Sequence, residues 1–414
     1  MTMRMRVRTT CRICGGSHLV RTLDLGAQPP SNSFLAPADI AAEQAFPLEM
    51  HLCTDCGLSQ LVHIVYSEDI FDDYLYLSST SRALCQHYQG LIDGALARFE
   101  PPAGALAVDI GCNDGIMLRR YPDGRCRLLG IEPSSAGKYA REAGFEVIDQ
   151  FFESGLAERL AASHGRAALI TATNVFAHVD DITSFAAGVR TLLADDGVFI
   201  IEFPYLVDMV ERLYFDTIYH EHLCYLALTP LDHLFAKVGL RAFRFERTEV
   251  GASGPALRLF VCRAESGRAT EDSITAMRAD EQAWGITDPA RYRDFAARVE
   301  QIRDRILALI AEVKAKGGRV GAYGAPAKGN TLLNYLKLGP ADIEVVAENN
   351  ALKVGKVTPG SHIPIVGDDS FLASGIDTAL LLTWNYLDFF LANSEFIKKG
   401  GKFIVPLPDV KIVP

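Results

Sequence analysis

The sequence predicts an α/β protein of three domains. Segments of strand length alternate with amphipathic helical segments in two separate runs, and two Cys-x-x-Cys pairs precede the first run. The 414 residues suffice for about two to three domains, each with its own core. A hydrophobic content of 49% and a charged content of 22% are typical of globular proteins, so a disordered or fibrous chain is excluded.

Charge and apolar runs exclude several classes of partner. Lys and Arg number 41 and Asp and Glu number 51, which gives a formal net charge of −10. An acidic chain is poorly suited to nucleic acid or anionic membranes. No apolar run approaches the roughly 18 residues of a spanning helix, and the amino terminus lacks the apolar core of a signal peptide. We therefore expect a soluble, cytoplasmic monomer with neither a membrane nor a nucleic-acid partner.

Residues 1–70 are predicted to form a zinc-ribbon-like domain. The four ligands are two Cys-x-x-Cys pairs, Cys11 with Cys14 and Cys53 with Cys56. Two such pairs in one short segment can place four thiolates around one tetrahedral Zn²⁺. Four cysteines close the coordination shell, so the expected role is structural. The alternative is four reduced cysteines in a core.

Residues 71–270 are predicted to form a mostly parallel sheet with helices. The expected strands lie at 106–110, 127–131, 168–171, 197–202 and 256–261, with helices at 136–143 and 182–193 between them. A helical pattern also precedes the first strand. Near its start, Tyr76 and Ser79 are candidates to reach into a neighbouring site, although most of that pattern serves packing.

A connecting helical segment is predicted at 271–317 and a second α/β domain at 318–414. The connector is amphipathic and ends at a Gly-Gly helix stop. The last domain is expected to have a strand at 319–323, a glycine turn, a helix at 330–338 and three further strands. These later strands are predicted at 343–347, 378–383 and 402–405.

The first turn of the middle domain predicts a cofactor site. Asp109 ends a strand and is followed by Gly111-x-x-x-Gly115, where the glycines let the backbone approach a ligand closely. The spacing differs from the Gly-x-Gly-x-x-Gly of dinucleotide sites, and the acidic loop suits a cation such as a sulfonium. Glu132, at the end of the next strand, can accept ribose hydroxyls, and Asp149 follows the strand after that.

These residues, in register, resemble the class I methyltransferases that use S-adenosylmethionine. The wider set of motifs resembles the NDP-sugar C-methyltransferases of antibiotic deoxysugar pathways, and most closely the C-3'-methyltransferases of tetronitrose biosynthesis. The added motifs are Ser78-Ser-Thr-Ser81, Thr173-Asn-Val-Phe-Ala-His178, Tyr219-His-Glu-His222, Tyr323-Gly-Ala-Pro-Ala-Lys-Gly-Asn330 and Pro359-Gly-Ser-His-Ile-Pro-Ile365. The family implies a Rossmann-like fold for the middle domain and a second Rossmann-like unit after it. It implies a cofactor site that comprises Asp109, Gly111, Asn113, Gly115, Glu132, Asp149 and Asn174.

The resemblance also implies the substrate and the roles of four side chains. The expected substrate is a dTDP-linked 3-amino-2,3,6-trideoxy-4-keto-hexose, methylated at C-3'. A carbon next to a ketone must lose a proton before it attacks, and histidine suits a base at neutral pH. By resemblance His222 is that base. Tyr219 and His178 are candidates to hydrogen-bond the keto oxygen, and Glu221 to orient a histidine or contact the amino group.

The carboxyl-terminal glycine turn is predicted to bind the dTDP portion. Backbone amides at a helix start and one lysine can hold a diphosphate, so Tyr323, Lys328 and Asn330 are the candidate ligands. The glycines could instead be plain turns of a degenerate nucleotide fold. The turn does not match a NAD fingerprint.

Two other functions remain open from the sequence. An O- or N-methyltransferase would use the same cofactor with a weaker base. A zinc-ribbon interaction protein would need no cofactor but would be expected to show a basic face, which the net charge of −10 does not favour.

Overall fold

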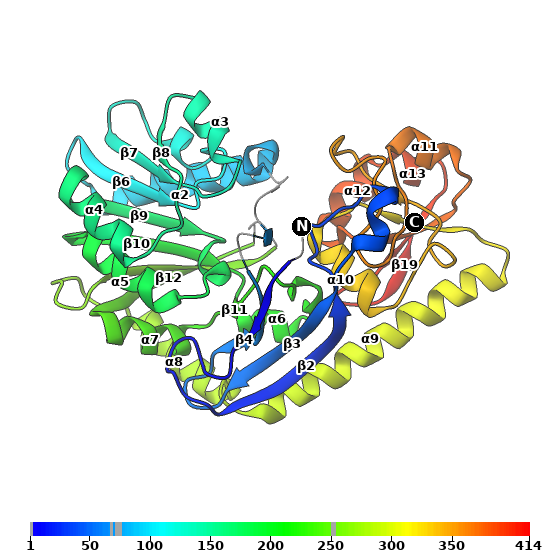
Figure 1. Cartoon of the computed structure of the whole chain (residues 1–414), viewed down its shortest axis with the longest axis horizontal. Coiled ribbons are helices and arrows are strands. Elements are labelled where there is room, and N and C mark those ends of the chain that lie inside the picture. The colour runs from blue at the N-terminus through cyan, green and yellow to red at the C-terminus, as the bar shows by residue number, and fades with distance from the viewer. Residues whose placement is uncertain (1–2, 67–68, 71–76, 250–253) are drawn as a thin grey trace.

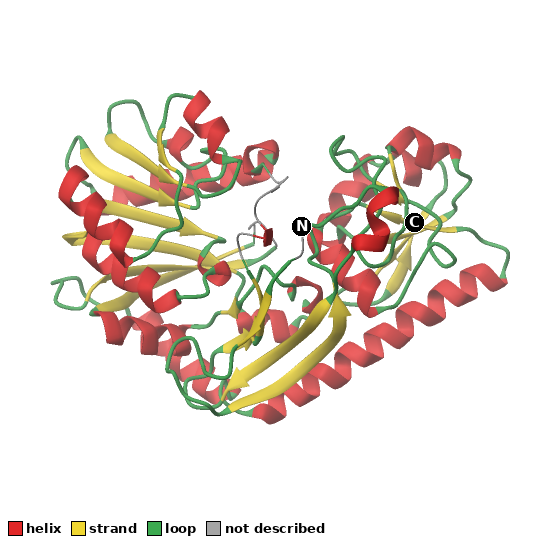
Figure 2. Cartoon of the chain, in the orientation of Figure 1, coloured by secondary structure: helices red, strands yellow, loops and turns green. Residues whose placement is uncertain are grey.

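The computed structural model describes residues 3–66, 69–70, 77–249 and 254–414. Two α/β units lie on opposite sides (Figure 1). The long strands β2 (Leu19–Gln28) and β3 (Phe46–Cys53) and helix α9 (Pro289–Ala315) run between them. Helices cover both large sheets (Figure 2). The predicted α/β class with an amino-terminal zinc-ribbon-like domain is therefore confirmed. Tyr76 lies outside the described residues.

The amino-terminal domain is built on an antiparallel sheet. Strands β2 (Leu19–Gln28) and β3 (Phe46–Cys53) pair, and β3 continues to β4 (Ser59–Leu61). Alternate β3 residues are buried, as the two-residue period of a strand with one covered face requires. The fourth strand, β11 (Cys224–Tyr225), comes from the middle of the chain and pairs with β4. A separate ribbon pairs β1 (Met5–Val7) with β5 (His63–Val65).

The middle domain has a seven-stranded sheet in the order β12-β13-β10-β9-β6-β7-β8. Five strands are parallel, and β13 and β12 add an antiparallel edge. The strands are β6 (Ala105–Ile110), β7 (Cys126–Ile131), β8 (Glu146–Ile148), β9 (Ala167–Thr173), β10 (Leu193–Phe203), β12 (Leu240–Thr248) and β13 (Ala256–Arg263). The helices are α2 (Arg82–Phe99), α3 (Gly137–Glu142), α4 (Ser154–His164), α5 (Ile182–Leu192), α6 (Leu206–Glu211) and α7 (Leu228–Val238).

Two helices lead into the carboxyl-terminal unit, α8 (Asp272–Trp284) and α9 (Pro289–Ala315). The unit's sheet has the order β16-β15-β14-β17-β18-β19, and only β19 is antiparallel. The strands are β14 (Val320–Tyr323), β15 (Val346–Ala347), β16 (Ile365–Val366), β17 (Thr378–Leu381), β18 (Lys402–Val405) and β19 (Lys411–Val413). The helices are α10 (Ala327–Tyr335), α11 (Asp368–Ala373), α12 (Leu387–Asn393) and α13 (Glu395–Lys398).

The predicted strands are present, although the bounds of several elements differ from the predicted ones. The helix expected at 330–338 begins earlier, at Ala327, because it starts directly after Pro326 at its N-cap. The strand expected at 343–347 is reduced to Val346–Ala347. No helix among the described residues is long and apolar enough to cross a membrane.

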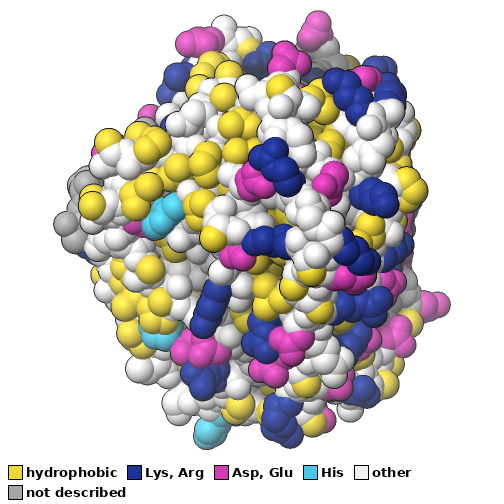
Figure 3. All heavy atoms as spheres, turned by 90° about the vertical axis from the view of Figure 1, so that its right-hand side faces the viewer, with side chains coloured by type: hydrophobic (Ala, Val, Ile, Leu, Met, Phe, Trp, Pro, Cys, Tyr) yellow, Lys and Arg dark blue, Asp and Glu magenta, His cyan; other side chains and the backbone are white. Residues whose placement is uncertain are grey.

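The face of the carboxyl-terminal side mixes charges of both signs. Basic and acidic side chains are interspersed there with apolar ones (Figure 3).

Candidate active site

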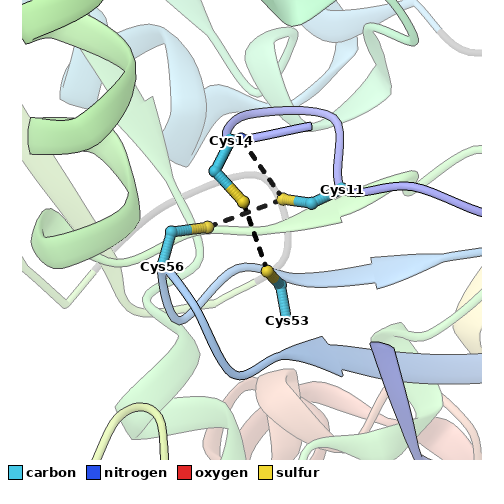
Figure 4. A group of neighbouring side chains, drawn as sticks. All are labelled: Cys11, Cys14, Cys53 and Cys56. Carbon is cyan, nitrogen blue, oxygen red and sulfur yellow. Dashed lines mark hydrogen bonds between the residues drawn. The ribbon is translucent and has the colours of Figure 1, made fainter. Parts of the chain in front are cut away.

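The four predicted zinc ligands lie together (Figure 4). Their ligand atoms are all within 4.8 Å of one another, and the Cys11 and Cys56 sulfurs are 3.5 Å apart. A tetrahedron with Zn–S bonds of about 2.3 Å separates its sulfurs by about 3.8 Å. The backbone amides of Ile13 and Cys14 donate to Cys11 Sγ, which stabilises a thiolate. The cluster fits Zn²⁺, and four sulfurs leave no open position for a substrate.

Three predicted acids lie at one edge of the middle sheet. Asp109 is in β6, Glu132 directly follows β7, and Asp149 directly follows β8. These strands are parallel neighbours, so their carboxyl ends meet at the same edge. Glu132 is buried, whereas the Asp149 side chain is 63% exposed. Asp149 Oδ2 lies 3.8 Å from the Arg141 guanidinium. The order of the acids therefore matches an extended ligand lying across the three strand ends.

The glycine turn holds Glu132 in place. Gly111 N donates to Ile131 O at 2.7 Å, and Asn113 N donates to Glu132 Oε2 at 2.8 Å. Gly111 has φ +72°, and a Cβ there would lie 2.2 Å from Val175 Cγ2. Only glycine fits this turn without displacing a neighbour. The arrangement fits the ribose and the adjacent part of S-adenosylmethionine.

The predicted cofactor residue Asp109 and the predicted substrate residue Ser79 both lie beside this turn, and Ser79 contacts Asp114 of the turn. Asp109 accepts the Thr171 hydroxyl at 2.6 Å, and burial raises the pKa of Asp109 to about 7. The Ser79 amide donates to Asp114 Oδ2 at 3.1 Å, and the Ser79 hydroxyl donates to the same oxygen. Asp114 Oδ1 is buried and has no hydrogen-bond partner among the described residues. This orphaned carboxylate oxygen fits a cationic ligand group.

Two further positions frame the turn. Gly115 has φ +82°, and Asn174 has φ +56° directly after β9. The Asn174 side chain donates to the Tyr88 hydroxyl at 3.4 Å. Both residues therefore lie at loop positions that border the same sheet edge.

His222 has a defined tautomer. Its Nδ1 lies 2.7 Å from Thr217 O. A carbonyl only accepts, so Nδ1 carries the hydrogen and Nε2 keeps its lone pair. Burial lowers the pKa of His222 to about 4, although the Thr217 carbonyl raises it somewhat. The imidazole is therefore neutral near pH 7 and can accept a proton at Nε2.

The other predicted catalytic side chains lie around this imidazole. The Tyr219 and His222 ring centroids are 4.0 Å apart, and those of His178 and His222 are 4.9 Å apart. Burial, with a further contribution from His222, holds the pKa of His178 well below its usual value. The rings of His178, Tyr219 and His222 therefore lie together, and burial favours the uncharged form of both histidines.

Glu221 directly precedes His222 in the sequence and is also buried. Burial raises the pKa of Glu221 to about 7, and its Oε1 accepts from Asn32 Nδ2 at 3.2 Å. Oε2 has no hydrogen-bond partner among the described residues. The carboxyl group is therefore poised near neutral pH, with one oxygen available to a ligand.

The three predicted carboxyl-terminal ligands already have protein partners. The Lys328 ammonium donates to Asn385 Oδ1 at 2.6 Å and lies 3.9 Å from the centroid of the Trp384 ring. Burial lowers the pKa of Lys328 to about 8. Asn330 Nδ2 donates to Ser31 O at 2.7 Å. Tyr323 is half-buried, with its hydroxyl 3.5 Å from Asp368 Oδ1.

Several residues of the site were not predicted from sequence. Thr217 acts through its backbone carbonyl, which no side-chain pattern reveals. Asn32 lies in the segment 29–34, whose Pro-Pro start was its only signal. Asp216 accepts from Trp384 Nε1 at 2.6 Å and joins the middle and carboxyl-terminal units directly beside Thr217.

Family models match three successive parts of the chain. A zinc binding domain matches residues 11–71, a methyltransferase domain matches 85–243, and a C-methyltransferase C-terminal domain matches 251–408. The chain is 35% identical over 406 residues to the C-methyltransferase NovU of Streptomyces niveus. That alignment covers 97% of this chain and 96% of the relative.

Solved structures resemble part of the chain. The magnesium protoporphyrin IX methyltransferase ChlM of Synechocystis PCC 6803 is 14% identical with a TM-score of 0.33, covering 47% of this chain and 88% of that one. A SAM-dependent methyltransferase from Anabaena variabilis is 14% identical with a TM-score of 0.33, covering 44% of this chain and 95% of that one. Both similarities cover less than half of this chain.

Proposed function

The chain belongs to the C-methyltransferase family, and we propose that it transfers the methyl group of S-adenosylmethionine to C-3' of a dTDP-linked 3-amino-2,3,6-trideoxy-4-keto-hexose. Membership rests on a relative that matches nearly the whole length and on the three family models. The substrate and the methylated position come from the motif resemblance and from the chemistry of the cluster around His222.

One observation carries the proposal. His222 is buried, and its Nδ1 donates to Thr217 O, so the lone pair of Nε2 has a defined direction. Transfer to carbon needs the removal of a C–H proton, and hydrogen bonds to the enolate oxygen lower the base strength that this step requires. A pre-oriented imidazole supports carbon as the acceptor.

The side chains divide the work as follows. His222 Nε2 takes the proton from C-3', and the electron pair moves into the enolate of the 4-ketone. Tyr219 and His178 hydrogen-bond the enolate oxygen in a cluster with little charge of its own, where such bonds are strong. Glu221 contacts the 3-amino group through its Oε2. S-adenosylmethionine supplies an electrophilic methyl group, which C-3' accepts.

The remaining predicted residues take binding roles. Asp109, Gly111, Asn113, Gly115, Glu132, Asp149 and Asn174 bind the methyl donor, and Cys11, Cys14, Cys53 and Cys56 bind structural zinc. Ser79 is proposed to contact the sugar, as is Tyr76, which lies outside the described residues. Tyr323, Lys328 and Asn330 are proposed for the dTDP side, although Lys328 would have to exchange a protein partner for a phosphate.

Hydrogen exchange at carbon tests the proposal. His222→Asn should still bind S-adenosylhomocysteine but should lose both methyl transfer and exchange of the C-3' hydrogen in D₂O, followed by NMR. Mass spectrometry with labelled S-adenosylmethionine should show a carbon-bound methyl in the product of the unsubstituted enzyme. Methyl on oxygen or nitrogen would refute the reaction, and unchanged exchange in His222→Asn would refute His222 as the base.

A binding measurement tests the assignment of Lys328. Lys328→Ala should weaken binding of the dTDP-sugar, most at low salt, because a charge contact is lost. Equal affinity at every salt concentration would show that Lys328 serves only its contacts with Asn385 and Trp384.

A further inference from the structure

The turn that supplies the Thr217 carbonyl is held by the carboxyl-terminal unit. It contains the short 3-10 helix η5 (Phe215–Thr217). The Asp216 carboxylate accepts from Trp384 Nε1 at 2.6 Å, although 168 residues separate the two in the sequence. Both side chains are buried, so this hydrogen bond is shielded from water. A hydrogen bond to a buried carboxylate is among the stronger ones that a side chain can make.

Two ring contacts add to this hydrogen bond. The ring centroids of Tyr214 and Trp384 are 4.7 Å apart, with 34° between the ring planes. The Phe215 ring packs edge-on against Tyr335 of α10, with the centroids 5.3 Å apart. Three consecutive residues of the middle domain, 214–216, therefore contact the carboxyl-terminal unit.

The position of Asp216 determines where the Thr217 carbonyl points. Thr217 N donates to Tyr214 O at 3.2 Å, and the Thr217 hydroxyl donates to the same oxygen at 2.7 Å. The Thr217 carbonyl itself accepts from His222 Nδ1 at 2.7 Å. Because a peptide unit is planar, a rotation at residue 216 would carry the next residue and its carbonyl with it. The contacts from Trp384 through Asp216 and Thr217 to His222 thus form a bridge from the carboxyl-terminal unit to the imidazole.

A second bridge of the same form ends at Glu221. Asn330 Nδ2 donates to Ser31 O at 2.7 Å, and the next residue, Asn32, donates to Glu221 Oε1 at 3.2 Å. In both bridges a side chain of the carboxyl-terminal unit binds one residue, and the next residue in the sequence contacts a proposed catalytic side chain. Both members of the Glu221–His222 pair are therefore supported from that unit.

The charge of Asp216 is also compensated from the carboxyl-terminal unit. Burial raises the pKa of Asp216 to about 6, and the charge of Lys328 and the hydrogen bond from Trp384 oppose this rise. Asp216 Oδ1 has no hydrogen-bond partner among the described residues. An apolar side chain of similar size would stabilise such a contact at least as well, so packing alone does not account for an aspartate here.

We propose that Asp216 is a positioning residue for the base, because its hydrogen bond with Trp384 fixes the Thr217 carbonyl that orients His222. Asp216 acts through Thr217, and no proton transfer is assigned to it. The inference rests on the proposed function in taking His222 as the base. The carboxyl-terminal unit then completes the active site of the middle domain by orienting one of its side chains.

Nitrogen NMR of the zinc-loaded full chain, labelled with ¹⁵N at histidine, tests the contact. His222→Asn identifies the His222 signals, which should show the hydrogen on Nδ1 in the unsubstituted protein. Trp384→Phe keeps an aromatic ring but removes the donor. The His222 signals should then average over both tautomers, and the C-3' hydrogen of the proposed substrate should exchange about tenfold more slowly.

Trp284→Phe is the matched control. Trp284 Nε1 also donates to a carboxylate at 2.6 Å, that of Glu211. Loss of that bond removes the same chemical contact without touching Asp216 or Thr217. Trp284→Phe should therefore change neither the His222 signals nor the exchange rate.

Substitutions of Asp216 separate positioning from stability. Asp216→Ala removes the acceptor and should repeat the effect of Trp384→Phe. The double variant should lose no more exchange than either single variant, because both changes break one contact. Asp216→Asn keeps an acceptor oxygen for Trp384 and should keep the hydrogen on His222 Nδ1. Circular dichroism and S-adenosylhomocysteine affinity should be unchanged in all of these variants.

The His222 signals decide the outcome. Unchanged signals in Trp384→Phe and Asp216→Ala would overturn the role of Asp216, whatever the exchange rate. Loss of the Nδ1 hydrogen in Asp216→Asn would also overturn it, and this conservative variant remains readable if the others fail to fold. The signals are read without turnover, so absent C-3' exchange in the unsubstituted enzyme would refute His222 as the base while the NMR result still shows whether Asp216 orients it.

Discussion

Replacing Gly111 by alanine tests whether crowding at the cofactor turn requires glycine. A left-handed φ of +72° costs an L residue about 1–2 kcal/mol. The new Cβ would also lie 2.2 Å from Val175 Cγ2 and 3.2 Å from Val175 Cγ1, and forcing a neighbour aside costs about 1–3 kcal/mol. We therefore expect Gly111→Ala to lose about 2–5 kcal/mol of unfolding free energy.

Gly104→Ala is the matched control. Gly104 has nearly the same φ, +71°, but a Cβ there meets nothing within 4 Å. It should lose only the backbone contribution of about 1–2 kcal/mol. Urea unfolding measures both variants, and titration with S-adenosylhomocysteine measures the site. Only Gly111→Ala should lose affinity, by about tenfold, because Asn113 N would move away from Glu132.

A double variant isolates the contact. Val175→Ala removes the two methyl carbons nearest the new Cβ. The double variant should therefore lose about 1–3 kcal/mol less unfolding free energy than the two single variants lose together. Equal losses for Gly111→Ala and Gly104→Ala, or strict additivity with Val175→Ala, would refute the argument from crowding.

The zinc site and the buried histidines give two further predictions. Cys56→Ala should abolish zinc binding, measured by elemental mass spectrometry. It should also lower the midpoint of urea unfolding, because metal binding contributes folding free energy. Retention of one zinc per chain would exclude Cys56 as a ligand. Burial lowers the pKa of both His220 and His222 to about 4, so each contributes stability that is present above about pH 6.5 and is lost as the pH falls through 4. His220→Asn should flatten the fall in unfolding free energy between pH 6.5 and 4 by up to roughly 1.4 kcal/mol per pH unit, and an unchanged slope would count against a neutral buried His220.

Local patterns predicted the parts of the structure that depend on neighbours in sequence. The glycines of the cofactor turn need positive φ, and strand periodicity placed Glu132 at a strand end. The spacing of the cysteines predicted that the two Cys-x-x-Cys pairs form one cluster. In each case a short segment carries the whole geometric requirement, so one sequence reveals it.

Contacts between distant segments could not be read in this way. The Asn32 side-chain amide donates to Glu221, which lies 189 residues later in the sequence. His222 Nδ1 donates to the backbone carbonyl of Thr217, and any residue type could supply that carbonyl. Lys328 was predicted in a local cationic turn, but it is buried against Trp384, a residue of a distant segment of the same unit. Sequence periodicity indicates that a residue is buried but not which distant segment buries it.

The fold gives the zinc cluster a mechanical connection to the proposed base. β4 starts three residues after Cys56 and pairs with β11, which begins two residues after His222. Leu61 N also donates to Leu223 O at 3.0 Å, directly beside His222. A zinc ion bound by four cysteines has no open coordination position for a substrate. Loss of the metal would nevertheless free β4, the strand that pairs with β11 at one end of the His222 loop. We therefore propose that the zinc domain supports catalysis by holding one end of the loop that carries His222, the proposed base.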